Sequence, residues 1–369
     1  MDEVPGRHAR DADGNPGSPV ADDRGAGIPN AGGDFAGGWL ETTGGVLFVR
    51  RAGPVDRVAG SAESPRAPLL FVHGLGGDSL DWAELAGVLR AHDPTQALIA
   101  IDLPGFGFSL PPADGDFSLD AHGRAIAGCI EALDCGPVHL VANSMGGSIA
   151  TRLAARRPEL FTSLTLISPA LPDPLPPRGS WQLLPAALPA IGPRLVSAGL
   201  RVDPEWVVHH AIRLCFGNPN RIDDTRRRLL FDIVRRRAGT AHGVDAYCAS
   251  LRSLIASYGR RRLWADAAAV DVPTLLVYGG RDRLVSPRSA YRALRAFPHA
   301  RLVFLPDAGH VPHLEAPEVV AGALMAFFRG APVVAGTGRP APPAGMVAAH
   351  ATVDVGATGP TLRDERTVS

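Results

Sequence analysis

The chain has 369 residues, of which 46% are hydrophobic, and its 37 basic and 37 acidic residues leave no formal net charge. The neutral net charge gives no indication of a nucleic acid or another strongly charged partner, so we expect no nucleic-acid binding. The length is sufficient for one large core with an inserted subdomain.

The amino-terminal segment, residues 1–38, is rich in Gly, Asp, Pro and Ala and has few large apolar residues. Such a segment cannot bury enough surface to offset its chain entropy, so we predict that it is disordered. A similar composition predicts a second disordered tail at residues 331–369. No early segment has the charged region followed by an apolar region that is typical of a secretory signal peptide. No run of about 18 apolar residues, as a membrane-spanning helix requires, occurs in the sequence. We therefore expect a soluble, cytoplasmic protein.

Strands and helices alternate after the first tail. Glu41–Arg50 is typical of the edge of a hairpin, and the short apolar runs at 68–72 and 97–101 predict buried strands. Helical patterns around 79–91 and 118–133 follow these strands. This alternation predicts an α/β fold, in which helices cover both faces of a mostly parallel, twisted sheet.

A strand, a sharp turn and a helix follow one another around Ser144. The β-favouring run Val138–Asn143 ends at this serine, and a helical segment follows at once. Ala142 and Gly146 stand two residues before and after the serine, where a strained turn tolerates only small side chains. The stretch therefore predicts a nucleophile elbow.

The alternation stops from Pro169 to about Val270, where no strand is predicted. Asp203-Pro204 supplies an N-cap and a first-position proline for one helix, and further helical patterns lie at 223–237 and 244–258. The sheet pattern returns at 273–278. We therefore assign residues 39–169 and 271–330 to the core and residues 170–270 to an inserted helical cap.

Two candidate partners for Ser144 lie in the last part of the chain. Asp282 follows an apolar strand and a Gly-Gly turn, and His310 follows the strand Leu302–Leu305. A serine needs a base to remove its proton, and the base needs an acid to orient it. We predict that Ser144 is the nucleophile, that His310 is the base and that Asp282 orients His310.

Five motifs together resemble the α/β-hydrolase superfamily, in the branch that carries a helical cap, from about Trp39 to Arg329. They are His73-Gly74-Leu75-Gly76, Asp102-Leu103-Pro104-Gly105-Phe106-Gly107, the Ser144 elbow, Gly279-Gly280-Arg281-Asp282 and Gly309-His310-Val311-Pro312-His313-Leu314-Glu315. The resemblance implies that the backbone N–H groups of Leu75 and Met145 form an oxyanion hole. It also implies that the cap roofs the active site and that no metal or organic cofactor is required.

Other residues compete for these roles. Asp173 is an alternative acid, although its proline-rich surroundings favour a surface position, and His313 is an alternative base. For His73 we favour packing and hydrogen bonding beneath the neighbouring loop, and for Asp102 a role as a structural cap. His209 and His210 are adjacent and do not share a helix face, so a metal pair is not expected.

The four cysteines and the arginine-rich cap have simple interpretations. Cys129, Cys135, Cys215 and Cys248 match no zinc spacing, so we interpret them as free thiols of a reducing compartment. The runs Arg226–Arg228, Arg235–Arg237 and Arg260–Arg262 are interpreted as solvated helix faces. The alternative is a basic cap surface that meets anionic lipid or an acidic substrate.

These residues predict a serine hydrolase that cleaves an ester, or a related acyl bond, of a small apolar substrate. One alternative is a carbon–carbon hydrolase of meta-cleavage products, from which Leu75-Gly76-Gly77 and Val311 depart. The other is a hydrolase-like binding protein without turnover, which the intact set of Ser144, Asp282 and His310 disfavours.

Overall fold

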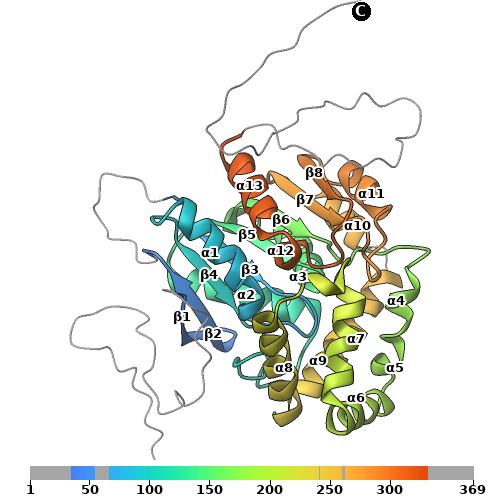
Figure 1. The fold of residues 1–369 in the computed structure, drawn as a ribbon. Coiled ribbons are helices and arrows are strands. Elements are labelled where there is room, and N and C mark those ends of the chain that lie inside the picture. Colours follow the sequence, from blue (N-terminus) through green and yellow to red (C-terminus); the bar gives the residue numbers. More distant parts are fainter. Residues whose placement is uncertain (1–34, 55–65, 241, 260–261, 331–369) are drawn as a thin grey trace, which may run out of the picture.

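A computed structural model describes residues 35–54, 66–240, 242–259 and 262–330 (Figure 1). The predicted disorder of residues 1–34 and 331–369 lies outside these ranges. Residues 36–38, which the sequence places in the first tail, open the first strand of the sheet.

Eight strands form a single sheet in the order β1-β2-β4-β3-β5-β6-β7-β8. The strands at the β1 edge, β1 to β2 and β2 to β4, pair antiparallel, and all other neighbours pair parallel. The bounds are β1 Ala36–Thr42, β2 Gly45–Ala52, β3 Leu69–Val72, β4 Leu98–Ile101, β5 Val138–Asn143, β6 Phe161–Ile167, β7 Thr274–Gly279 and β8 Ala300–Leu305. The predicted mostly parallel α/β sheet is confirmed.

Helices cover the sheet on both faces because its central strands are apolar on both sides. Every residue of β3 and of β4 is buried. The helices α1 (Ala83–His92) and α13 (Pro317–Phe328) pack on one face. The 3-10 turn Ser79–Trp82 directly precedes α1. On the other face lie α2 (Leu119–Leu133), α3 (Met145–Ala154) and α11 (Ser289–Ala296). The short helix α12, Pro312–Glu315, precedes α13.

A helical insertion, α4 to α10, separates β6 from β7 and lies at one end of the sheet (Figure 1). Its helices are α4 Arg178–Trp181, α5 Leu184–Ala187, α6 Ile191–Val202, α7 Pro204–Cys215, α8 Asp224–Gly239, α9 Gly243–Gly259 and α10 Arg262–Ala268. The Asp203 carboxylate accepts a hydrogen bond from Trp206 N at 2.7 Å and caps α7 as predicted. The sequence did not predict α4 to α6, whose first residues have no side-chain cap and lie among prolines.

Three cap arginines dock on the core, which corrects their interpretation as solvated. Arg226 is only 3% exposed and contacts Glu84 at 2.9 Å, and Arg236 contacts Asp78 at 2.9 Å. Arg237 donates a hydrogen bond to the carbonyl oxygen of Gly76. These side chains lie on faces of α8 that meet the core, and the paired carboxylates and the carbonyl offset the loss of hydration.

Candidate active site

Ser144 stands in the turn between β5 and α3, with φ of 52° and ψ of −117°. This conformation is rare for a residue with a Cβ, and close packing around the turn enforces it. A Cβ on Gly146 would lie 2.6 Å from the carbonyl oxygen of His73, so only glycine fits there. Strand and helix therefore approach each other closely, and the serine is held at the tip of the turn as predicted.

His310 and Asp282 meet beside this turn, although they lie at the ends of different strands. His310 Nδ1 lies 2.8 Å from Asp282 Oδ2, and both residues are buried. The other oxygen of Asp282 accepts hydrogen bonds from the backbone N–H groups of Leu284 and Val285 at 2.8 and 2.9 Å. The Asp173 carboxylate instead accepts a hydrogen bond from Leu175 N within its own turn. Asp282 is therefore the carboxylate that contacts His310.

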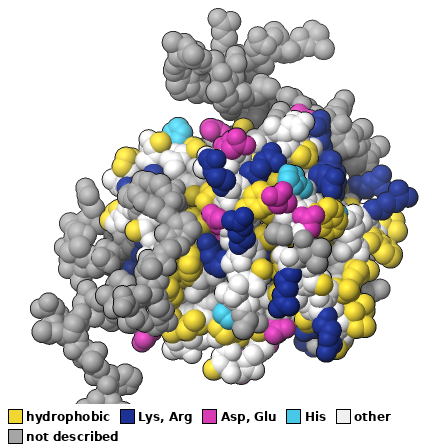
Figure 2. Space-filling view, turned by 60° about the horizontal axis from the view of Figure 1, so that its bottom comes forward, with side chains coloured by type: hydrophobic (Ala, Val, Ile, Leu, Met, Phe, Trp, Pro, Cys, Tyr) yellow, Lys and Arg dark blue, Asp and Glu magenta, His cyan; other side chains and the backbone are white. Residues whose placement is uncertain are grey.

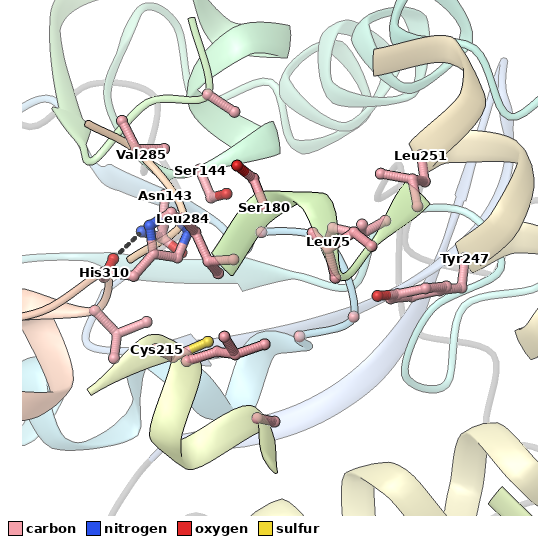
Figure 3. A pocket seen from close by; sticks show the side chains of 18 of the residues that line it. Leu75, Asn143, Ser144, Ser180, Cys215, Tyr247, Leu251, Leu284, Val285 and His310 are labelled. Carbon is pink, nitrogen blue, oxygen red and sulfur yellow. Dashed lines mark hydrogen bonds between the residues drawn. The ribbon is translucent and has the colours of Figure 1, made fainter. Parts of the chain in front are cut away.

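The backbone of His310 is fixed from two sides. Asn143, the residue before the serine, donates its side-chain amide to the His310 carbonyl at 3.1 Å (Figure 3). The His310 N–H donates to the carbonyl of Cys215 at 2.6 Å, at the end of the cap helix α7. The Glu315 carboxylate accepts from both Gly309 N and Gly217 N. The cap therefore helps to position the histidine loop.

The glycine-rich loop after β3 forms a tight turn against the serine. Gly77 N donates to the carbonyl of Gly74 at 3.2 Å, and Gly76 has φ of 80°, which glycine adopts without strain. A Cβ on Gly74 would lie 3.0 Å from the Cβ of Ser144. This contact brings the Leu75 backbone near Ser144. The second N–H group of the predicted oxyanion hole belongs to Met145, the first residue of α3, and the first N–H groups of a helix have no partner within the helix. The Met145 side chain is fully buried in the core.

Arg237 reaches this loop from the cap. Its guanidinium donates to the Gly76 carbonyl and lies over the Tyr247 ring, 5.0 Å from the ring centroid. Burial lowers the pKa of Arg237, while Tyr247 and nearby carboxylates oppose the shift. The side chain therefore ties α8, α9 and the glycine-rich loop together.

A cavity of about 450 Å³ lies between the core and the cap. Ser144 and His310 lie at one end, and Tyr247 and Leu251 lie at the other (Figure 3). Its wall is mainly apolar, with cap residues such as Val208 and Leu254. The Cys215 thiol also lines the cavity, and burial raises its pKa to about 12, so it is not a competing nucleophile at neutral pH.

The remaining candidates have structural contacts. Buried His73 accepts a hydrogen bond from Leu103 N at 3.0 Å, and burial lowers its pKa to about 4. Asp102 accepts from Ser79 N at 2.6 Å, as expected of a structural cap. The buried His313 ring stacks on Trp82.

The adjacent histidines of α7 and the four cysteines also have ordinary surroundings. His209 Nδ1 lies 2.8 Å from the Glu205 carbonyl, whereas the His210 ring stacks on Trp206. Their rings therefore contact different groups. All four cysteines are thiols that form no disulfide, as predicted.

Sequence reasoning did not identify Arg237, Asn143 or Glu315 as positioning residues. The Asn143 position, directly before the nucleophile, is a signal that could have indicated its contact with the histidine loop. Glu315 lies five residues after His310, close enough to turn back toward the loop. No local signal distinguishes Arg237 from its neighbours in Arg235–Arg237, because the distinction depends on the cap docking.

Comparison with known proteins gives one family and several relatives. The model of the alpha/beta hydrolase fold family matches residues 67–317. The dihydrolipoyllysine-residue acetyltransferase component of the acetoin cleaving system of Pseudomonas putida is 31% identical over 265 residues, which cover 71% of this chain and 63% of that protein. Lipase 3 of Moraxella sp. (strain TA144) is 26% identical over 71% of this chain and 78% of its own length.

Solved structures agree with these matches. A crystal structure described as a membrane phospholipase A, a bacterial virulence factor, has a TM-score of 0.62 and 26% identity and covers 80% of this chain and 86% of that chain. Further relatives include a pimeloyl-[acyl-carrier protein] methyl ester esterase and a 2-hydroxy-6-oxononadienedioate/2-hydroxy-6-oxononatrienedioate hydrolase. The chain is thus related to lipases, esterases and hydrolases of meta-cleavage products.

Proposed function

Because the chain belongs to the alpha/beta hydrolase fold family, we propose that it is a serine hydrolase that cleaves carboxylic esters through an acyl-enzyme. The observation that carries this proposal is the convergence of three groups. Ser144 stands at the strained turn, and His310 shares one cavity with it while bonded to Asp282 at 2.8 Å. A binding protein has no need to hold a serine in a costly conformation next to an oriented imidazole.

The proposed reaction follows from these positions. His310 takes the proton of the Ser144 hydroxyl as the oxygen attacks the ester carbonyl, and Asp282 stabilises the imidazolium that forms. The N–H groups of Leu75 and Met145 stabilise the oxyanion of the tetrahedral intermediate. The imidazolium returns its proton to the departing alcohol, and water then hydrolyses the acyl-enzyme by the same steps.

The cavity supports an apolar substrate. Its wall is mainly aliphatic and aromatic side chains of the cap, and Ser144 and His310 lie at one end (Figure 3). Such a cavity binds an acyl or alcohol chain through burial of apolar surface, while the polar end orients the ester. We therefore assign esters with an apolar chain as the substrate class.

The test is labelling with a fluorescent fluorophosphonate, followed by turnover of p-nitrophenyl esters of increasing chain length. The wild-type protein should be labelled and should turn over the esters, and Ser144→Ala should do neither, with a loss of about 10⁶-fold in turnover. Asp173→Asn serves as a matched surface control and should be labelled normally. A Ser144→Ala protein that retained a tenth of the activity would contradict the proposed nucleophile.

A carbon–carbon hydrolase is the second candidate, favoured by the Asn143-Ser144-Met145-Gly146-Gly147 elbow and by the relative of that activity. A dienone substrate tested beside the ester panel separates the two reactions. Turnover of the dienone with no turnover of any ester would replace the ester proposal.

A further inference from the structure

The outer edge of the cap exposes large apolar side chains that a soluble domain ordinarily buries. Six of them lie on α4 to α6 and the connector before α4, and each is between 44% and 82% exposed: Leu175, Trp181, Leu184, Leu188, Ile191 and Leu195. We call this set the apolar cap edge. The three helices follow one another along one side of the cap in Figure 1, and hydrophobic side chains gather at this border of the molecule in Figure 2. An exposed apolar patch of this kind indicates an interaction surface.

The charged residues of α4 to α6 are all arginines. The sequence contains no acidic residue between Asp173 and Asp203, but it contains Arg178, Arg194 and Arg201, all of which are exposed. Asp245 of α9 lines the same surface hollow as Arg194 and Arg201 and is the acidic residue among the residues that line it. The arginine side chains of Figure 2 lie beside the hydrophobic ones at this border. Aromatic and aliphatic residues next to arginines are typical of segments that lie in the interface of an anionic membrane.

The apolar cap edge is continuous with the cavity. Trp181 and Leu184 are exposed at the surface, and both also line the cavity that contains Ser144. An apolar chain that leaves a lipid layer at these side chains would enter the cavity without crossing water. Leu188, Ile191 and Leu195 do not line the cavity, so the edge extends beyond what substrate binding requires.

We propose that the apolar cap edge docks on the surface of an anionic lipid layer and that apolar esters enter the cavity from that layer. The delivery of esters rests on the proposed function, whereas docking does not. A second copy of the chain fits this surface less well, because a symmetric dimer would bring the three arginines of each copy together. No helix among the described residues is long and apolar enough to cross a membrane, and docking requires none. The apolar cap edge is not the basic cap surface that the arginine runs of the sequence suggested. Arg226, Arg236 and Arg237 of those runs contact the core instead.

Flotation of the full-length protein with vesicles tests the docking. One set of vesicles is pure phosphatidylcholine, and the other is an equal mixture of phosphatidylcholine and phosphatidylglycerol. We expect binding to the mixed vesicles that weakens with added salt and is weaker by about tenfold on the neutral vesicles. Ser144→Ala should bind as the wild type does, because docking requires no turnover.

A triple variant, Leu188→Gln/Ile191→Gln/Leu195→Gln, removes the part of the edge that lies outside the cavity. It should bind the mixed vesicles about tenfold or more weakly, because less apolar surface enters the interface. Its turnover of a short, soluble ester should equal that of the wild type, which also shows that the variant is folded. The matched control is Val319→Gln, which replaces an apolar residue of α13 that is 54% exposed, and it should bind normally.

Several results would overturn the proposal. These are absence of wild-type binding to both vesicle types, equal binding to both, or normal binding by the triple variant. A wild-type dimer that the triple variant converts to a monomer, without vesicle binding, would identify the edge as a self-association surface. Failure of the wild type to hydrolyse any ester would count against the proposed function, and the flotation result would still decide the docking.

Discussion

The core and the cap are held in place by different interactions. In the core, each group of the proposed triad follows a strand whose position the hydrogen bonds of the sheet fix. The cap docks through long side chains instead, and Arg226 and Arg236 of α8 pair with core carboxylates, one on α1 and one just before the 3-10 turn Ser79–Trp82. The difference indicates that the core fixes the chemistry, whereas the cap determines which molecules reach it.

The division is not complete, because the cap also contacts loops that belong to the core. Cys215 at the end of α7 accepts a hydrogen bond from His310 N, and Arg237 of α8 donates one to Gly76. The cap therefore contacts both the histidine loop and the loop proposed to stabilise the oxyanion. Variants of core and cap residues can measure how far the division holds.

The largest effect is expected for the acid of the core. Asp282→Asn should lower turnover by about 10⁴-fold, because the asparagine favours the wrong tautomer of His310. Steady-state kinetics with a short ester measures the loss, and Asp173→Asn should change little because its carboxylate accepts a hydrogen bond within its own turn rather than from His310. The opposite ranking would transfer the acid role to Asp173.

A smaller effect is expected for the cap residue that touches the core loop. Arg237→Met should lower kcat by up to about 100-fold with little change in KM for a short ester, because the loop that carries Leu75 loses a contact that positions it. Arg237→Lys keeps a donor and should recover part of the loss. The matched control is Arg226→Met, which removes another buried contact between cap and core without touching this loop. Equal kcat losses in Arg237→Met and Arg226→Met would mean that Arg237 acts only through cap docking.

The wall of the cavity should control selectivity without affecting the chemistry. Leu251 of α9 is buried and lines the cavity far from Ser144 (Figure 3). Leu251→Trp should reduce kcat/KM by about tenfold or more for long-chain esters and leave short-chain esters unchanged, because the added volume fills the far end. An unchanged chain-length profile would mean that selectivity lies in the core loops.

The smallest effect concerns stability at the junction of the two regions. His122 of α2 is fully buried, contacts Ser250 of α9 at 2.9 Å and has a pKa that burial lowers to about 3. In the unfolded chain His122 takes up a proton as the pH falls through about 6.5, whereas in the folded chain it stays neutral. The contribution of neutral His122 to the free energy of unfolding is therefore complete above that pH and is lost as the pH falls below it. Between pH 7 and 5.5 the wild type should lose about 1 kcal/mol more than His122→Gln. Urea unfolding at both pH values measures the difference, and equal losses would contradict the role of His122.

The sequence predicts the core better than the cap for physical reasons. Buried parallel strands and the small residues around Ser144 leave local signals, so the sheet and the positions of Asp282 and His310 could be predicted. The helices α4 to α6 lack side-chain caps, and Pro185, Pro189 and Pro193 lie in their first turns or between them, so their pattern is weak. The role of Arg237 depends on contacts between α8 and a loop far away in the sequence, which no local pattern records.

The backbone conformation of Ser144 has a consequence for the evolution of the chain. A φ of 52° with a ψ of −117° is one that glycine adopts without penalty and serine does not. Ser144→Gly should therefore raise the free energy of unfolding by about 1 to 3 kcal/mol, whereas Ser144→Ala keeps the strained Cβ and should not. In lineages that no longer need turnover, drift toward glycine at position 144 would then carry a gain in stability, so the serine persists only while its hydroxyl is under selection.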